Sequence, residues 1–472
     1  MHLPVGPPHR RVCVYPLEVA PGDITRRASY GALSPVVGDR GARTRQSIVD
    51  AALTLFAERG FHDTTVDDIA GAVGVSRAAL YQYFESKEQL FVELMHESGS
   101  ALLRVVRRLG PLGPTEEGYD NLHWWLGEWA WVYDKYSTMY VQWANVETPE
   151  APLRPLILQF MDGYASRMHD RLARNHVRDL PPEAAAMVLL AVVNRTNYYR
   201  HTSTVRGLSD EQVLDTLATV VQYILFPDTP PEAIIAVTRS LSAAEAPVWV
   251  RPAAEPPVPV GLDQDRFAGS SDRVRTTIRH LLDAGGRVFG ARGYNIASVD
   301  DIVTEAGLGR GTFYKYFDDK LDLLSVLAEE CAGQLPQMME DLRRIPVGAD
   351  GAAPRRVWLR EFVHFHRRYA GVFRILQQQA PVAPGLEVMR GRVLDTMLVV
   401  LDELLAGVKR HYPFCIPAAS LVLLALLERL PDQVLGSRYD MSSEDLAELL
   451  AVVVEHGFLN GGVRIPPPSG SP

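Results

Sequence analysis

The chain has 472 residues, enough for two to four domains of ordinary size. Apolar residues make up 47% of it and charged residues 22%, which is typical of soluble globular proteins and excludes a collagen-like or wholly disordered chain. The formal net charge of −9 argues against a nucleic-acid partner unless basic residues gather locally.

The three cysteines predict neither a disulfide framework nor a zinc site, because Cys13, Cys331 and Cys415 lie far apart without paired spacing. Apolar stretches are far shorter than the roughly 20 residues that cross a bilayer, and the N-terminus lacks a continuous apolar signal core. We therefore expect a protein of the reducing cytoplasm with no membrane partner.

An internal repeat organises the sequence. Aligned with itself at an offset of 233, the chain shows sixteen identities in the 42 positions from Asp50 to Phe91. Weaker matches continue beyond this block, such as Trp125 with Trp358. The offset predicts two copies of one larger module.

The repeat and the Pro-rich stretch between its copies predict the domain layout. We expect, in order, a disordered leader (1–40), a first helix-turn-helix domain (41–92), a first helical effector and dimerisation domain (93–242), a Pro-rich linker (243–271), a second helix-turn-helix domain (272–325), a second helical domain (326–460) and a disordered tail (461–472).

Each repeated block predicts three short helices. In the first copy an apolar face over residues 48–56 predicts a helix that Gly60 ends, and Thr65 with Asp68 predicts a capped second helix. Gly74 then breaks the chain, and Ser76 caps a helix that runs to Phe84. The second copy repeats this plan, but Gly309 replaces the Ser76 cap, so its last helix should be less firmly set.

Two helices joined by a short Gly-containing turn form a helix-turn-helix. The runs AALTLFAERGFHDTTVDDIAGAVGVSRAALYQYFESKEQL and DAGGRVFGARGYNIASVDDIVTEAGLGRGTFYKYFDDKLDL resemble the DNA-binding domain of the tetracycline-repressor (TetR) family. The resemblance covers about 50 residues in each half and implies an all-α fold of two tandem modules. Compact three-helix units without DNA contacts are the alternative.

The resemblance implies DNA contacts from both copies. Gln82 and its counterpart Lys315 differ, and Gln favours adenine while Lys favours guanine, so the two copies should read non-identical half-sites. The candidate DNA-binding residues are Thr65, Ser76, Arg77, Ala78, Tyr81, Gln82, Tyr83 and Lys87, and in the second copy Ser298, Arg310, Gly311, Thr312, Tyr314, Lys315, Tyr316 and Lys320.

The charge balance permits DNA binding through a few contacts. Residues 273–320 carry eight basic side chains against six acidic ones, a local charge of +2. Seven arginines between Arg10 and Arg45 form either a basic arm or part of a solvated leader.

Aromatic residues gather after each block, in the region where the resemblance implies a ligand-binding domain. Ordinary core packing accounts for most of them, and the alternative is a pocket for a small hydrophobic or aromatic effector. The candidate pocket residues are Trp125, Trp129, Tyr133, Tyr136, Tyr140 and Trp143, and in the second half Trp358, Phe362, Phe365, Tyr369 and Phe373.

Strongly apolar helices close each half, at 182–199 with 211–225 and at 417–430 with 444–458. In the family such helices build a dimer interface, so the halves either pair within one chain as a pseudo-dimer or belong to a homodimer. No metal motif or catalytic motif is found, and no enzymatic activity or cofactor is expected. The chain is predicted to be a DNA-binding transcriptional regulator, most often a repressor in this family, released by a small effector. A helical scaffold protein with degenerate DNA-reading surfaces is the alternative.

Overall fold

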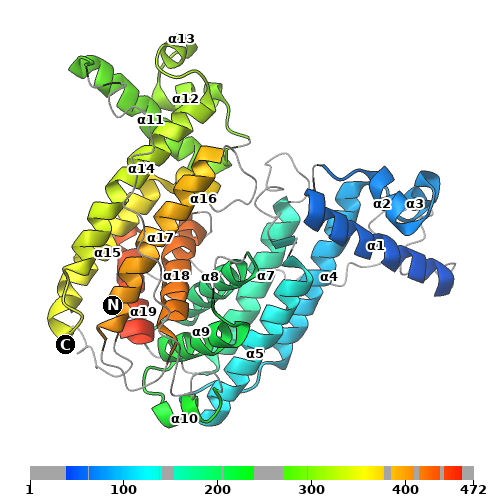
Figure 1. Ribbon diagram of the computed structural model, residues 1–472. Coiled ribbons are helices and arrows are strands. Elements are labelled where there is room, and N and C mark those ends of the chain that lie inside the picture. Colours follow the sequence, from blue (N-terminus) through cyan, green and yellow to red (C-terminus); the bar gives the residue numbers. More distant parts are fainter. Residues whose placement is uncertain are drawn as a thin grey trace, which may run out of the picture. The chain divides into compact units, whose positions relative to one another are not determined.

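A computed structural model describes the following residues of the chain: 39–61, 63–137, 139–140, 154–175, 177, 179–202, 207–238, 267, 269–294, 296–376, 384–408, 414–435 and 441–459. Within these ranges every regular element is a helix, which confirms the expected all-α class (Figure 1). Residues 1–38 of the expected leader, most of the linker at 243–271 and the tail at 461–472 lie outside them.

The helices of the first half follow the breaks expected from glycine and proline. In chain order they are α1 (Asp39–Arg59), α2 (Val66–Val73), α3 (Arg77–Tyr83), α4 (Lys87–Arg108), α5 (Glu116–Lys135), α7 (Arg154–Ala173), α8 (Pro182–His201), α9 (Asp210–Leu225) and α10 (Pro231–Ile235).

The second half repeats the same order. Its elements are α11 (Asp272–Arg292), α12 (Val299–Ala306), α13 (Arg310–Tyr314), α14 (Lys320–Arg343), η1 (Ala349–Gly351), α15 (Ala352–Arg368), α16 (Ala370–Leu376), α17 (Pro384–Ala406), α18 (Ile416–Leu435), α19 (Ser443–Val454) and η2 (Glu455–Leu459).

The repeat found in the sequence extends to the helix ends. α1 and α11 begin and end at equivalent positions of the two copies, as do α2 and α12. Far outside the repeated block, Ser209 caps α9 and Ser442 caps α19, and these two serines are again equivalent positions at the same offset. The chain therefore contains two copies of one helical module, and the regions after the repeated block share their helix order even where few residues match.

The chain divides into two compact units, Met1–Phe91 and Val92–Pro472. The first unit holds α1 to α3 and the start of α4, around a core that includes three rings. Phe61 lies 5.3 Å from Phe56 and 5.2 Å from Phe91 between ring centroids, in tilted and edge-on arrangements that aromatic rings favour.

The second unit contains the remaining helices of both halves. α8 and α18 pack against each other, although they lie in different halves of the sequence (Figure 1). Both helices are buried along most of their length: α18 presents a continuous buried run from Leu421 to Leu427. Burial on all sides explains why these helices are apolar all round rather than amphipathic.

The second helix-turn-helix block packs closely on its own helical domain. α11 meets α16 through glycines, and a Cβ on Gly371 would lie 2.5 Å from the Cβ of Phe289. Arg374 on α16 also donates to the carbonyl of Gly290, at 3.0 Å.

None of the helices in the described ranges is long and apolar enough to span a bilayer.

Candidate nucleic-acid interface

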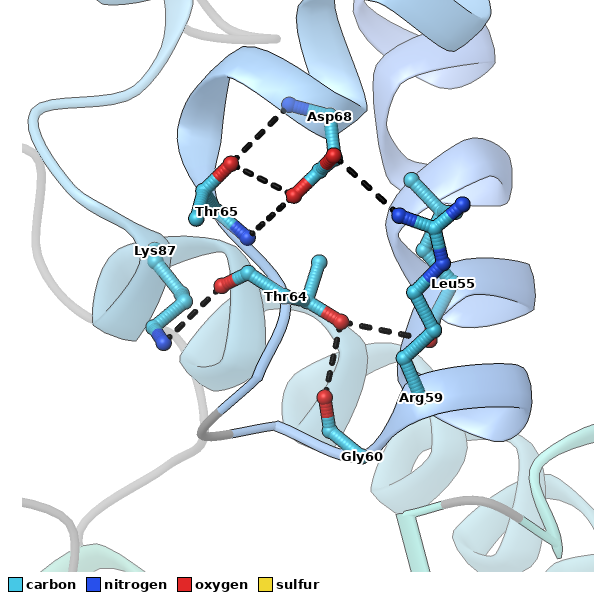
Figure 2. Close-up of polar contacts among 7 residues, drawn as sticks. All are labelled: Leu55, Arg59, Gly60, Thr64, Thr65, Asp68 and Lys87. Carbon is cyan, nitrogen blue, oxygen red and sulfur yellow. Dashed lines mark hydrogen bonds and ion pairs between the residues drawn. The ribbon is translucent and has the colours of Figure 1, made fainter.

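The turn before α2 is held by a capping box. Thr65 Oγ1 accepts a hydrogen bond from the backbone of Asp68 (3.2 Å), and Asp68 Oδ2 accepts one from the backbone of Thr65 (2.9 Å), as Figure 2 shows. The Thr65 hydroxyl also donates to Asp68 Oδ2. This bond first, then the bond from the Thr65 backbone and the guanidinium of Arg59, lower the pKa of Asp68. Ser298 and Asp301 repeat this box, which confirms both predicted cap pairs.

The turn between the two helices requires glycine. Gly74 and Gly307 have φ values of 72° and 66°, in the left-handed region where a side chain is strained. The chain then reverses tightly, with Val75 donating to the carbonyl of Ala70 at 3.0 Å. This turn places α3 across the end of α2, in the predicted helix-turn-helix arrangement.

α3 buries one face and exposes the other. Leu80 and Phe84 are fully buried, while Arg77, Tyr81 and Gln82 are exposed, Tyr81 by 41%. Ser76 accepts a hydrogen bond from Ala79 at 3.1 Å and so begins the helix as predicted. The exposed face thus carries hydroxyl, amide and guanidinium groups, which can form hydrogen bonds with phosphate oxygens and base edges.

The exposed arginine of α3 is oriented by the helix before it. Arg77 Nη1 lies 2.8 Å from Asp67 Oδ2, and its guanidinium also contacts Tyr81, 5.6 Å from the ring centroid. Its pKa is raised, first by the hydrogen bond to Tyr81 and then by the charge of Asp67. The arginine is thus held against the first turn of α2, while its side chain stays exposed.

The second copy presents the same face on a shorter helix. α13 has five residues where α3 has seven, and Gly309 gives it no side-chain cap, as predicted. Phe313 and Phe317 are buried, while Tyr314 (55%) and Lys315 are exposed. Arg310 binds Asp300, with Nη2–Oδ2 at 2.7 Å, and so repeats the pair on α3.

Lys87 and Lys320, for which the resemblance implies phosphate contacts, bind backbone carbonyls in the structure. Lys87 Nζ donates to the backbone carbonyls of Phe61 (2.7 Å) and Thr64 (3.0 Å), the second of which is drawn in Figure 2. Lys320 repeats these bonds with Tyr294 and Ala297, both at 2.9 Å, and each ammonium lies 4.6 Å from a ring centroid. The structure thus uses these ammonium groups to join the start of α4 and α14 to the loop that precedes α2 and α12.

The remaining candidates divide between exposed and half-buried positions. The hydroxyls of Thr65, Ser76 and Ser298 serve as helix caps. Ala78 and Gly311 are exposed in the first turn of α3 and α13. Tyr83, Thr312 and Tyr316 are half-buried. Thr64, which sequence reasoning missed, is fully buried and donates to the carbonyls of Leu55 and Gly60.

Three of the candidate aromatic residues of the first half form a stacked group. Tyr133 lies 4.8 Å from Tyr140 and 5.6 Å from Trp129 between centroids, and Trp129 Nε1 donates to Tyr164 at 2.9 Å. Burial raises the pKa of Tyr133 far above its ordinary value. Trp125 and Tyr136 are also buried, whereas Trp143 lies outside the described residues.

The second half has its own aromatic group on α15 and α16. Trp358 stacks on Phe362 at 5.3 Å, and Phe365 contacts both Tyr369 (4.9 Å) and Phe373 (6.0 Å). The polar atoms of this group bind within the protein, since Trp358 donates to the carbonyl of Met338 and Tyr369 accepts from Gln334. The structure therefore brings together Trp129, Tyr133 and Tyr140 in the first half and the five predicted aromatic residues of α15 and α16 in the second.

Comparison with known proteins identifies the two blocks. Residues 48–94 and 281–327 both match the profile described as "Bacterial regulatory proteins, tetR family". The chain thus carries two domains of this family. Each match covers α2, the glycine turn and α3, or their counterparts α12 and α13, and the two matches begin and end at equivalent positions of the repeat.

Relatives share the same region. The "Biofilm operon icaADBC HTH-type negative transcriptional regulator IcaR" of Staphylococcus aureus strain Newman is 33% identical over 109 residues, which is 22% of this chain and 55% of that protein. The protein of the same name from Staphylococcus epidermidis is 28% identical over 133 residues, 28% of this chain and 68% of that protein. The chain thus spans about half the length of the first of these relatives.

Proposed function

We propose that the protein is a DNA-binding transcriptional regulator whose single chain carries two DNA-binding domains, at 41–92 and 272–325. These two domains are called the reading heads below. The observation that carries this proposal is the exposed face of α3, repeated on α13, at the end of a capped helix and a glycine turn. The name of the Staphylococcus relatives describes negative regulation, which favours a repressor. The acidic total charge is compatible with this function, because few contacts to phosphate are needed.

The two heads are proposed to read different half-sites. Gln82 and Lys315 occupy equivalent exposed positions, and a Gln amide matches adenine whereas a Lys ammonium matches guanine O6 and N7. Because the two half-sites differ, the proposed operator is an imperfect palindrome. Heads that enter successive major grooves of this operator would need centres about 34 to 36 Å apart.

The remaining segments take the roles expected of the family. We propose DNA-binding domains at 41–92 and 272–325, helical domains at 93–242 and 326–460 that bind effector and pair with each other, and a connecting linker at 243–271. The stacked aromatic groups around Tyr133 and Phe365 are the proposed sites for a small hydrophobic effector in the cytoplasm. Effector binding releases the DNA if it favours a different separation of the two heads.

Binding to the DNA upstream of the protein's own gene tests the function. In a fluorescence-anisotropy titration we expect sequence-selective binding that Tyr81→Ala weakens by about 10-fold or more. Arg360→Ala, which removes an ion pair with Glu444 on the half-buried side of α15, serves as the control and leaves the affinity unchanged. Equal affinity for this DNA and for random duplex would contradict the proposal.

A second variant tests the half-sites. Gln82→Lys makes the two heads alike, so the preferred base in the first half-site should change from adenine to guanine. Randomised half-sites read out by selection and sequencing measure this change. Unchanged preference at every position of the first half-site would show that Gln82 does not contact a base.

A further inference from the structure

A buried ion pair joins the two halves within the unit Val92–Pro472. Arg195 on α8 donates to Glu428 on α18 from Nε (3.0 Å) and from Nη2 (2.9 Å), and the side chains are only 8% and 6% exposed. The hydroxyl of Tyr199 also donates to Glu428, and the guanidinium lies 4.4 Å from the ring centroid of Tyr198. This carboxylate therefore has three donors in a site that excludes water.

The two charged residues occupy equivalent positions of the duplication. Arg195 and Glu428 are 233 residues apart, the same offset that separates the two copies. Where two copies of a module pair about a two-fold axis, residues on the axis meet their own counterparts. The contact between Arg195 and Glu428 therefore marks the axis that relates α8 to α18.

A second pair of equivalent residues meets between α9 and η2. α9 packs on η2, and a Cβ added to Gly457 would lie only 2.7 Å from Cγ1 of Ile224. Ile224 and Gly457 are again counterparts at the offset of the duplication. A large side chain on one copy thus fills the space left by the missing side chain on the other.

Neither half could make these contacts with a second copy of itself. Two first halves would bury Arg195 against Arg195 and Ile224 against Ile224, a like-charge pair beside an overpacked contact. Two second halves would bury Glu428 against Glu428 and face Gly457 with Gly457, a like-charge pair beside a gap. Burying two like charges together costs far more free energy than burying an ion pair. Each face is therefore complementary only to the other.

We propose that the contact surface between the halves is heterotypic: the α8–α9 face of the first half accepts the α18–η2 face of the second half and rejects a second copy of itself. The covalent connection supplies the correct partner at high effective concentration. The surface that a single-module protein of this kind would offer to a second chain is therefore occupied within one chain. This inference concerns assembly and does not depend on DNA binding.

Full-length variants recreate the rejected interfaces inside the native chain. Glu428→Arg places two arginines at the axis, as two first halves would, and Arg195→Glu places two glutamates there. Gly457→Ile recreates the overpacked contact. The matched control is the double variant Arg195→Met with Glu428→Leu, which fills the same positions without charge.

Sedimentation equilibrium and urea unfolding, followed by far-UV circular dichroism without DNA, give the readouts. We expect the wild-type chain to sediment with the mass of one chain. Each like-charge variant should shift the unfolding equilibrium of the second unit by about 100-fold or more toward the unfolded state. The neutral double variant should stay within about 10-fold of the wild type.

The outcomes separate charge rejection from general intolerance. Like-charge variants that fail to fold while the neutral double folds as a single chain support the proposal. A neutral double that fails as badly, like-charge variants as stable as the wild type, or a wild-type chain that sediments as two chains overturns it. If the wild-type chain showed no selective DNA binding while the sedimentation and unfolding results were as expected, only the proposed function would be contradicted.

Discussion

Asp67 and Arg77 form an ion pair of 2.8 Å on the exposed side of the helix-turn-helix, and Asp300 and Arg310 repeat it in the second copy. The carboxylate holds the arginine against the first turn of α2, but it also competes with any phosphate for the same guanidinium. Exposed pairs of this kind contribute little to stability because water screens the two charges, so a DNA phosphate can replace the aspartate at little cost.

Neutralising Asp67 should therefore strengthen DNA binding. Asp67→Asn releases Arg77 and removes a negative charge beside the phosphates, so we expect affinity to rise by about 2- to 5-fold at low salt and the gain to shrink as salt increases. Anisotropy titrations at several salt concentrations measure this. Glu117→Gln, an exposed change at the start of α5, is the control. Weaker binding by Asp67→Asn would mean that the pair positions Arg77 for DNA.

Substitution of Lys87 distinguishes a structural role from a phosphate contact. Lys87→Met removes hydrogen bonds to two carbonyls, so we expect the first unit to lose about 1 to 3 kcal/mol of its free energy of unfolding. The slope of log affinity against log salt should stay unchanged, because no phosphate contact is lost. A slope reduced by about one, with stability intact, would restore the phosphate role. Lys320→Met offers the same comparison in the second copy.

The capping-box carboxylate predicts an acid-sensitive first unit. Because the pKa of Asp68 is lowered in the folded state, its contribution to stability is complete above its ordinary pKa, near pH 4, and is lost as pH falls through the lower folded value. Asp68→Asn should thus unfold more readily than the wild type at pH 7, and the difference should vanish in strong acid. Urea midpoints between pH 2 and 7 measure it, with the exposed Asp63→Asn as the control. A difference that is constant with pH would contradict this assignment.

A serine at position 309 should strengthen the second reading helix. Gly309 has the extended backbone of a helix N-cap, and a Cβ there would meet no atom within 4 Å. Gly309→Ser can therefore cap α13 as Ser76 caps α3, and we expect a gain of a few tenths of a kcal/mol. Slower amide exchange of the first residues of α13 measures the gain. Ser76→Gly should produce the opposite change in α3, and no change in either variant would show that the cap does not limit these helices.

Local signals in the sequence predicted the reading heads well. Apolar periodicity, the cap pairs Thr65–Asp68 and Ser298–Asp301, and the turn glycines act within a few residues, so the sequence shows them directly. Burial of Leu80 and Phe84 opposite an exposed Tyr81 follows from the same helical period. The family match covers this same region and little else.

Contacts between distant residues could not be predicted in this way. The ammonium of Lys87 binds carbonyls 23 and 26 residues earlier in the chain, where nothing but the fold brings them together. The resemblance placed this residue on phosphate because it supplies a position and a residue type but no local geometry. Thr64 was missed for the same reason, since its acceptors become its neighbours only when the helix ends at Gly60.

The sequence by itself determined that the chain is two copies of one helical module, because a repeat at a constant offset is visible without any structure. It left open whether the copies pair with each other or with a second chain, since apolar helices such as α8 and α18 fit either arrangement. Only the tertiary structure placed Arg195 against Glu428 and Ile224 against Gly457. Charge and shape complementarity exist only between surfaces in contact, so no property of either segment alone could reveal them.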